Sequence, residues 1–158
     1  MNTLIALGYF ILAFGGMEAV AWFTHKYIMH GMLWNLHKDH HQTESNSPVQ
    51  KNDLFFLFFS LPGILLIFLG VTQAPPSPEL WLGLGITAYG FCYFLVHDIF
   101  IHRRIRMNFA AVNFYFAALR KAHKMHHKHL NREHGECFGM LWVPVKYFIE
   151  AMKAKKLQ

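Results

Sequence analysis

The chain has little cysteine and few acidic residues. Of its 158 residues, two are cysteine, and nine are aspartate or glutamate against 15 lysine or arginine. Cys92 and Cys137 show none of the spacings typical of zinc sites or disulfide frameworks, so we expect both to be reduced and structural. The acidic residues form no Glu-x-x-His pair of the kind that soluble di-iron bundles use. A metal site in this chain must therefore draw on other ligands.

Charge is also scarce in three long segments. Residues 3–24 contain a single charged residue, Glu18, and residues 54–72 and 80–96 contain none. Each segment is long enough to cross about 30 Å of hydrocarbon as a helix, which agrees with a chain that is 54% hydrophobic. We therefore predict an all-α integral membrane protein. It should be a helical bundle of three to four transmembrane helices that forms a single domain over residues 1–158.

The remaining segments complete the predicted topology. The first apolar segment lacks a basic start, so we expect it to stay in the mature chain rather than act as a signal peptide. Pro62 should kink the second span, and QAPPSPE at 73–79 should form a rigid turn. The apolar stretch 107–119 is short, which favours a re-entrant or interfacial helix over a fourth span. The tail 140–158 should form an amphipathic helix at the membrane surface.

The basic residues indicate an orientation. The segment 25–53 carries three lysines and 103–132 carries eight lysines and arginines, whereas the turn 73–79 has neither. By the positive-inside rule, residues 25–53 and everything after residue 97 should face the cytoplasm. The net charge of +6 is then explained by cytoplasmic loops and lipid headgroups, so we predict membrane lipid and no nucleic acid as its partner. All 12 histidines fall on the same predicted side.

Ten of these histidines follow two repeated spacings, HxxxxH and HxxHH, which form a histidine-rich cap. In chain order the four boxes are His25 and His30; His37, His40 and His41; His97 and His102; and His123, His126 and His127. Positions i, i+3 and i+4 share one helix face, so each HxxHH box should present three imidazoles in one direction. Positions i and i+5 lie about 140° apart on an ideal helix. An HxxxxH pair can therefore bind one metal only if the helix is distorted, or it reaches two metals.

This many imidazoles indicates a transition-metal site, because neutral imidazole binds iron, copper, zinc and nickel well. Ten ligands exceed the capacity of one metal, whereas two metals with four or five imidazoles each would use them all. Asp98 is a candidate to orient a ligand imidazole through its second ring nitrogen. His129 and His134 lie outside the repeated spacing and are weaker candidates. Glu18, an ionisable residue within a span, is either functional or simply hydrogen-bonded to a neighbouring helix.

A two-metal site at the membrane edge favours oxygen activation on an apolar substrate, since two irons can share the electrons that splitting O₂ requires. Redox-inactive zinc could support hydrolysis, but hydrolysis rarely needs so many neutral ligands. A metal carrier is a different class, and it predicts exchangeable metal and ligands within the spans. Bis-histidine haem is a further alternative, which needs only paired ligands.

The four histidine boxes, in this order, resemble the fatty acid hydroxylase superfamily of membrane di-iron enzymes. Residues 17–41, 51–56, 89–104 and 119–144 closely resemble the bacterial-type β-carotene 3-hydroxylases, most specifically through HKYxMHG and HDxxxHR. The resemblance extends from about Met17 to Pro144. A sterol or fatty acyl hydroxylase, or a desaturase, is the alternative on the same scaffold.

The resemblance implies a monooxygenase that adds hydroxyl groups at carbon 3 of the β-ionone rings of β-carotene, giving β-cryptoxanthin and then zeaxanthin. It implies two non-haem iron ions, which zinc can replace in a purified protein, together with O₂ and a ferredoxin-like electron donor. The apolar carotenoid would come from the bilayer, and the active site would face the cytoplasm from a bacterial inner membrane. By box, the resemblance assigns iron binding to His25, His30, His37, His40, His41, His97, His102, His123, His126 and His127.

Overall fold

A computed structural model describes residues 1–42, 49–73, 77–105, 113–130, 133 and 135–156. Every regular element in these ranges is helical, which confirms the all-α prediction. In chain order the elements are α1 (Thr3–Phe23), η1 (Thr24–Met32), α2 (Trp34–His41), η2 (Lys51–Asp53), α3 (Leu54–Val71), α4 (Pro78–Phe94), η3 (Leu95–Ile101), α5 (Phe114–Lys128) and α6 (Val145–Lys156).

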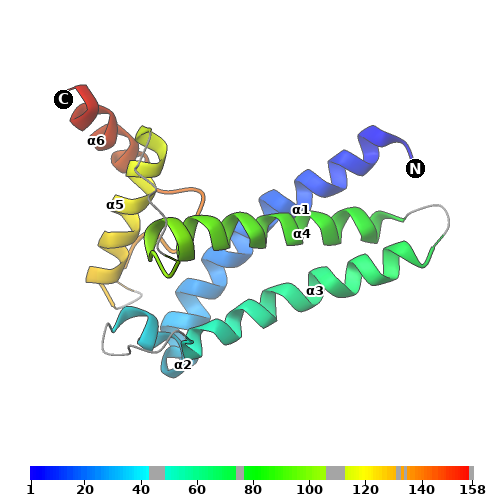
Figure 1. Cartoon of the computed structure of the whole chain (residues 1–158), viewed down its shortest axis with the longest axis horizontal. Coiled ribbons are helices and arrows are strands. Elements are labelled where there is room, and N and C mark those ends of the chain that lie inside the picture. The colour runs from blue at the N-terminus through cyan, green and yellow to red at the C-terminus, as the bar shows by residue number, and fades with distance from the viewer. Residues whose placement is uncertain (43–48, 74–76, 106–112, 131–132, 134, 157–158) are drawn as a thin grey trace.

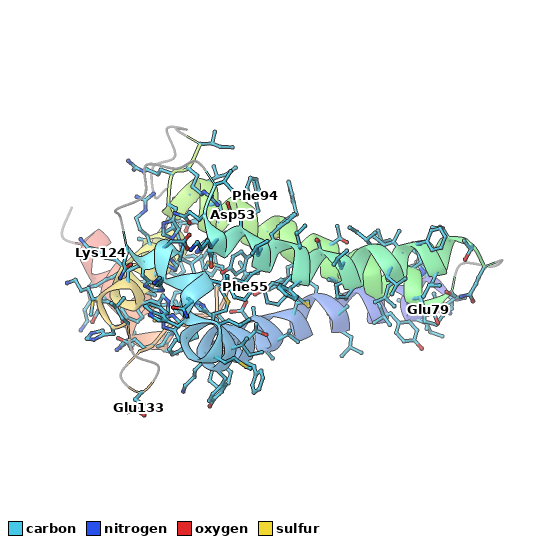
Figure 2. The ribbon with its side chains drawn as sticks, turned by 90° about the horizontal axis from the view of Figure 1, so that it is seen from below. Asp53, Phe55, Glu79, Phe94, Lys124 and Glu133 are labelled. Atoms are coloured by element: carbon cyan, nitrogen blue, oxygen red, sulfur yellow. The ribbon has the colours of Figure 1, made fainter. Side chains whose placement is uncertain are left out.

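Three helices are long and apolar enough to cross a membrane: Thr3–Met32, Lys51–Val71 and Pro78–Ile101. The first and third extend past the predicted spans because η1 and η3 follow directly on α1 and α4, and η1 has a kink at Gly31 near its end. Figure 1 shows the three helices running side by side, with the N-terminus at one end and α2, α5 and α6 gathered at the other. In Figure 2 Glu79 lies at the first end and Lys124 and Glu133 lie at the second.

Glycines allow α4 to pack closely against both other spans. A Cβ atom on Gly83 would lie 2.7 Å from the backbone nitrogen of Ile67 in α3. A Cβ atom on Gly85 would lie 2.5 Å from the carbonyl oxygen of Phe10 in α1. Such close approach of backbones is typical of membrane helices, which associate through van der Waals contact. The tight packing fixes where α1 and α4 end, and hence where their histidines lie.

The opposite end of the molecule has a core of its own. Buried side chains from α5, α6, η3 and the segment between α5 and α6 pack together: Val96, Ala118, Leu119, Ala122, Cys137, Met140, Val143, Tyr147 and Ala151. The predicted short helix 107–119 falls partly outside the described residues, and α5 begins at Phe114 behind the N-cap Asn113. It continues through the second HxxHH box to Lys128. The predicted C-terminal helix corresponds to α6, and both cysteines are free.

Candidate metal centre

All ten histidines of the four boxes meet at the end of the bundle that holds α2 and α5. Ring nitrogens within 4.8 Å of one another define two groups. The first group consists of His25, His30, His37, His41 and His126, and the second consists of His40, His97, His102 and His123. His127 lies beside both, since its Nε2 is 2.9 Å from Nε2 of His123 and its ring centroid is 4.3 Å from that of His41. Long-range packing thus gathers four boxes that the sequence separates.

The HxxxxH pairs lie in widened helical turns. η1 and η3 are π-helices, in which the N–H of His102 donates to the carbonyl of His97, five residues earlier. This hydrogen-bonding pattern brings positions i and i+5 close together, and such turns are frequent at functional sites. His25 and His30 have ring centroids 5.1 Å apart, and His97 and His102 have theirs 4.5 Å apart. Of the two alternatives, the structure therefore has the distorted helix, with each pair in one group.

Each HxxHH box is divided between the two groups, which corrects the expectation that its three imidazoles point in one direction. In α2, His37 and His41 belong to the first group and His40 to the second. In α5, His126 belongs to the first group and His123 to the second. Nearby positions on each helix thus reach different groups. The two boxes consequently link the groups into one centre.

Six of the ten imidazoles donate their Nδ1–H to an oxygen atom outside the groups. The donors and acceptors are His25 to the Phe138 carbonyl (2.9 Å), His30 to the Leu130 carbonyl (2.8 Å), His37 to Asn52 Oδ1 (2.6 Å), His40 to Gln50 Oε1 (3.3 Å), His97 to Asp98 Oδ2 (3.3 Å) and His126 to the Glu136 carbonyl (3.0 Å). In a neutral imidazole a proton on Nδ1 leaves a lone pair on Nε2. These contacts therefore aim six Nε2 lone pairs inward, as in the outer contacts of metal-bound histidines.

The distances between the inward nitrogens fit a metal ion. Nε2 of His25 is 3.0 Å from Nε2 of His37, and Nε2 of His40 is 3.0 Å from Nε2 of His97. Two lone pairs facing each other at this distance repel unless a cation lies between them. Two nitrogens bound at about 2.1 Å and at right angles to the same ion would be about 3.0 Å apart. The donor set thus suits a transition metal in each group.

Burial keeps these imidazoles in the neutral form that binds metal. His37 and His126 are 1% and 0% exposed. Loss of hydration on burial lowers the pKa of His37 to about 3 and that of His126 to about 2. The same cause lowers the pKa of the less buried His127 to about 4. Because neutral imidazole is the ligand form, the centre is ready for metal at neutral pH.

The residues that orient the imidazoles are mostly ones that the sequence did not single out. Asp98 was a candidate, and it lies against His97 and accepts from Arg104 at 2.9 Å. Asn52 and Gln50 were missed, although they belong to a short polar run between the first HxxHH box and the second span. Their position in this polar run, close to the first HxxHH box, was the feature of the sequence that could have identified them. The carbonyl acceptors at 130, 136 and 138 have no signature in the sequence, because any residue supplies a carbonyl.

Of the two weaker histidine candidates, only His129 is among the described residues, and it belongs to neither group. His129 is exposed at the end of α5, and His134 lies outside the described residues. Glu18 is half-buried and accepts a hydrogen bond from the Tyr89 hydroxyl at 2.6 Å and others from backbone N–H groups near residue 140. Glu18 belongs to neither histidine group, and its contacts are with α4 and the segment between α5 and α6.

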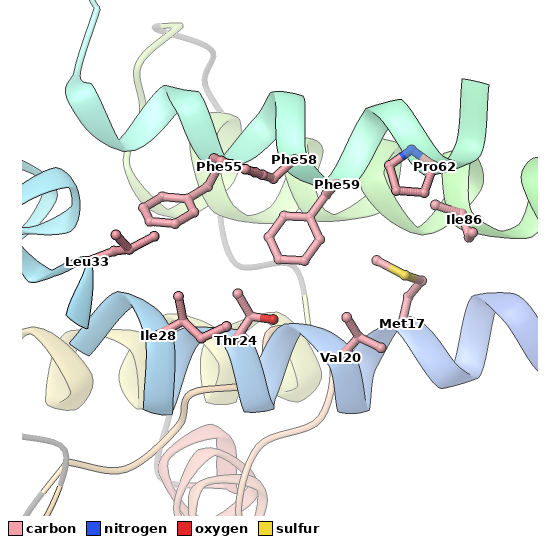
Figure 3. A pocket seen from close by; sticks show the side chains of 10 residues that line it. All are labelled: Met17, Val20, Thr24, Ile28, Leu33, Phe55, Phe58, Phe59, Pro62 and Ile86. Atoms are coloured by element: carbon pink, nitrogen blue, oxygen red, sulfur yellow. The ribbon is translucent and has the colours of Figure 1, made fainter. Parts of the chain in front are cut away.

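An apolar cavity of about 490 Å³ lies between the first span and α3 (Figure 3). Its lining is almost entirely apolar: Met17, Val20, Thr24, Ile28, Leu33, Phe55, Phe58, Phe59, Pro62 and Ile86. At one end the ring of buried Phe55 lies 6.3 Å from the ring of His37. Along its side Val20 and Phe58 are exposed on the apolar surface of the spans. The cavity therefore opens toward the lipid-facing surface and ends beside Phe55, whose ring packs against His37 of the first histidine group.

Comparisons with known proteins extend over most of the chain. The family model described as fatty acid hydroxylase matches residues 10–145. A β-carotene hydroxylase of Pantoea ananas is 41% identical over 82% of this chain and 72% of its own length. One from Pseudescherichia vulneris is 38% identical over 90% of this chain and 77% of its own length. The chloroplastic β-carotene hydroxylase 1 of Capsicum annuum is 37% identical, over 75% of this chain and 39% of its own length. The comparison with solved structures found no match.

Proposed function

This chain belongs to the fatty acid hydroxylase family, and on that premise we propose that it is a membrane enzyme that hydroxylates a carotenoid. The observation that carries the proposal is the pair of largely buried imidazole groups, in each of which the ring nitrogens lie within 4.8 Å of one another. The names of the bacterial and plant relatives support β-carotene as the substrate. The positions that we propose for hydroxylation are carbon 3 of each β-ionone ring, giving first β-cryptoxanthin and then zeaxanthin.

The reaction inserts one atom of O₂ into a ring C–H bond. The other oxygen atom leaves as water, which takes two protons and two electrons from an external donor. We assign one iron ion to each histidine group, with zinc as a substitute in purified protein, because all-imidazole sites accept either metal. Bound iron would supply the redox chemistry for activating O₂.

The protein itself positions the ligands and excludes water. The Nδ1–H contacts prevent six rings from turning, so that their Nε2 atoms point inward before any metal arrives. Burial of His37 and His126 keeps bulk water from the first group and keeps both rings neutral. A preorganised, dry site of this kind lowers the reorganisation that a reaction requires.

The cavity between the first span and α3 is the proposed substrate site (Figure 3). From Met17 to Ile28 it follows about 16 Å of helix, at 1.5 Å per residue. An apolar ring with part of its polyene chain can enter from the lipid through the side exposed at Phe58 and advance toward Phe55. The apolar lining supplies no charged partner, which favours a hydrocarbon over a lipid with a polar headgroup.

Electrons would arrive at the end of the molecule that faces water. We place this end on the cytoplasmic side of a bacterial inner membrane, following the distribution of lysine and arginine. Lys124 and Lys128 are exposed on α5, the helix that carries the second HxxHH box. A ferredoxin-like donor with an acidic surface would be attracted to them at low ionic strength.

Pigment chromatography of bacteria that accumulate β-carotene tests the function. Cells expressing this chain should form a mono-hydroxylated and then a di-hydroxylated carotenoid. His126→Ala removes a buried ligand of the first group and should abolish both products. The matched control is His129→Ala, which removes an exposed histidine from the same helix end and should leave both products unchanged.

Unchanged β-carotene from a chain present in the membrane fraction at normal level would refute the carotenoid function. Products that persist in His126→Ala would refute the assignment of the reaction to the histidine centre. A product hydroxylated elsewhere on the ring would overturn only the proposed position.

A further inference from the structure

Glu18 lies on α1, within the first span, and accepts hydrogen bonds from four groups. Its Oε1 accepts from the backbone N–H groups of Met140 (2.9 Å), Leu141 (3.1 Å) and Trp142 (2.8 Å). Its Oε2 accepts from the hydroxyl of Tyr89 on α4 at 2.6 Å. An ionisable side chain within a span is costly unless it is paired, and these donors compensate it. Glu18 thus joins two spans to a segment more than 120 residues away in the sequence.

The segment that it holds, residues 136–142, is called the anchored loop below. Two of its carbonyl groups accept from ring N–H groups of the first histidine group. The Phe138 carbonyl accepts from His25 and the Glu136 carbonyl accepts from His126. The Phe138 ring also packs against both imidazoles, at centroid distances of 5.6 and 5.2 Å. The position of the anchored loop therefore determines the direction of two proposed ligands.

The anchored loop contains no helix or strand, so its own backbone does not fix its position. Cys137 has a φ of 63°, a left-handed conformation that costs free energy for a residue with a side chain and persists only where surrounding contacts impose it. A Cβ atom on Gly139 would lie 2.5 Å from Oε1 of Glu18. The carboxylate and the loop are thus in direct contact, with no room for a side chain at residue 139.

The second histidine group does not use the anchored loop. Among the described residues, its ring N–H contacts outside the groups are with Gln50, which accepts from His40, and with Asp98, which accepts from His97. These acceptors lie just before η2 and in η3. A displacement of the anchored loop should consequently disturb one group and leave the ligand contacts of the other intact.

We propose that Glu18 is a positioning residue for the metal of the first histidine group, acting through the anchored loop on His25 and His126. The carboxylate fixes the three N–H groups of the loop, and the loop fixes the two carbonyl groups that orient the imidazoles. The inference rests on the proposed metal binding by the histidine groups and is independent of the substrate.

Metal affinity of the purified protein tests the role. The protein, loaded anaerobically with Fe²⁺, is titrated with a chelator that becomes coloured on binding this ion. His25→Ala and His97→Ala identify which phase of release belongs to the first group and which to the second. Leucine has a size similar to that of glutamate but no hydrogen-bond acceptor. Glu18→Leu should therefore lower the Fe²⁺ affinity of the first group about 10–100-fold, which is the range for loss of an outer contact to a metal ligand, and leave the affinity of the second group unchanged.

Three further variants separate positioning from general stability. Glu18→Gln keeps one oxygen as an acceptor for the backbone N–H groups and should retain most of the Fe²⁺ affinity of the first group. Gly139→Ala displaces the carboxylate from the side of the loop, without a change in α1, and should also weaken the first phase selectively. Tyr9→Phe removes a hydroxyl group from the same span and serves as the control with both phases unchanged.

Equal weakening of both phases in Glu18→Gln and Gly139→Ala would overturn the proposal, because Glu18 would then act only on the stability of the whole fold. Unchanged affinity in Glu18→Leu would overturn it as well. If the wild-type chain retains no Fe²⁺ in either phase, the proposed function fails together with this inference, and that result is distinguishable from the other two.

Discussion

Replacing Asn52 by alanine should weaken metal binding at the first histidine group selectively. Asn52 Oδ1 accepts from Nδ1–H of the His37 imidazole at 2.6 Å, and His37 is 1% exposed, so the lost acceptor leaves a buried donor on this ring. In the metal-free protein the proton can shift to the other ring nitrogen. A metal at Nε2 forces the proton onto Nδ1, and the cost of the unsatisfied donor then falls on the metal-bound state.

The magnitude follows from the cost of a buried unsatisfied donor, which is about 1–3 kcal/mol. Since about 1.4 kcal/mol corresponds to a factor of ten, the metal affinity of the first group should fall about 5- to 150-fold. This range agrees with the effect of about 10–100-fold expected for loss of an outer contact to a metal ligand. The second group should keep its affinity, because His40 is oriented by Gln50 instead.

The same chelator titration with Fe²⁺ measures this change. Asn52→Asp retains an acceptor at the same position and should hold the metal at least as well as the wild type. Lys51→Ala changes an exposed side chain in the same short helix and is the matched control. Wild-type affinity in Asn52→Ala would refute the argument that Nδ1–H contacts set the affinity of the centre.

Three other predictions concern acid, packing and the substrate cavity. The pKa of His37 is about 3 in the folded state and about 6.5 in the unfolded chain, so the unfolded chain binds more protons between these two pH values. The stability of the fold and its retention of metal should therefore be complete above about pH 6.5 and decline as the pH falls toward 3. Metal release as a function of pH measures this decline. Gly83→Ala places a Cβ atom 2.7 Å from the backbone of α3 and should destabilise the bundle by about 1–3 kcal/mol, which a lower melting temperature in detergent would show. Gly90→Ala is the control: its Cβ atom meets no atom within 4 Å, and it should leave the melting temperature unchanged. Val20→Trp fills part of the cavity and should raise KM for the carotenoid while the metal content stays unchanged. Leu12→Trp, at an exposed position on the same helix, is the control and should alter neither quantity. A KM of Val20→Trp equal to that of the wild type would exclude the cavity as the substrate site.

The contacts of Glu18 illustrate the limit of reasoning from one sequence. Its presence in an apolar segment identified it as a residue that needs a partner. The partners are a hydroxyl from α4 and three backbone N–H groups between α5 and α6. Backbone groups are the same in every residue, so no pattern of side chains predicts which segment will supply them.

The sequence by itself determined the helical class, the three apolar spans and the set of ten histidines. Long uncharged segments must span lipid as helices, because only internal hydrogen bonding satisfies the backbone there. The repeated HxxxxH and HxxHH spacings identified imidazole as the ligand type. The apolar spans and the histidine boxes could both be found in this way because each depends on residues that are close together in the chain.

Only the tertiary structure decided how these histidines are shared. It places His37 and His40 of one box in different groups, and it brings His25 and His30 together through a π-helical turn. It also forms the apolar cavity beside Phe55. The physical reason is that grouping depends on the distances between packed helices, whereas sequence periodicity specifies only the direction of a side chain on its own helix.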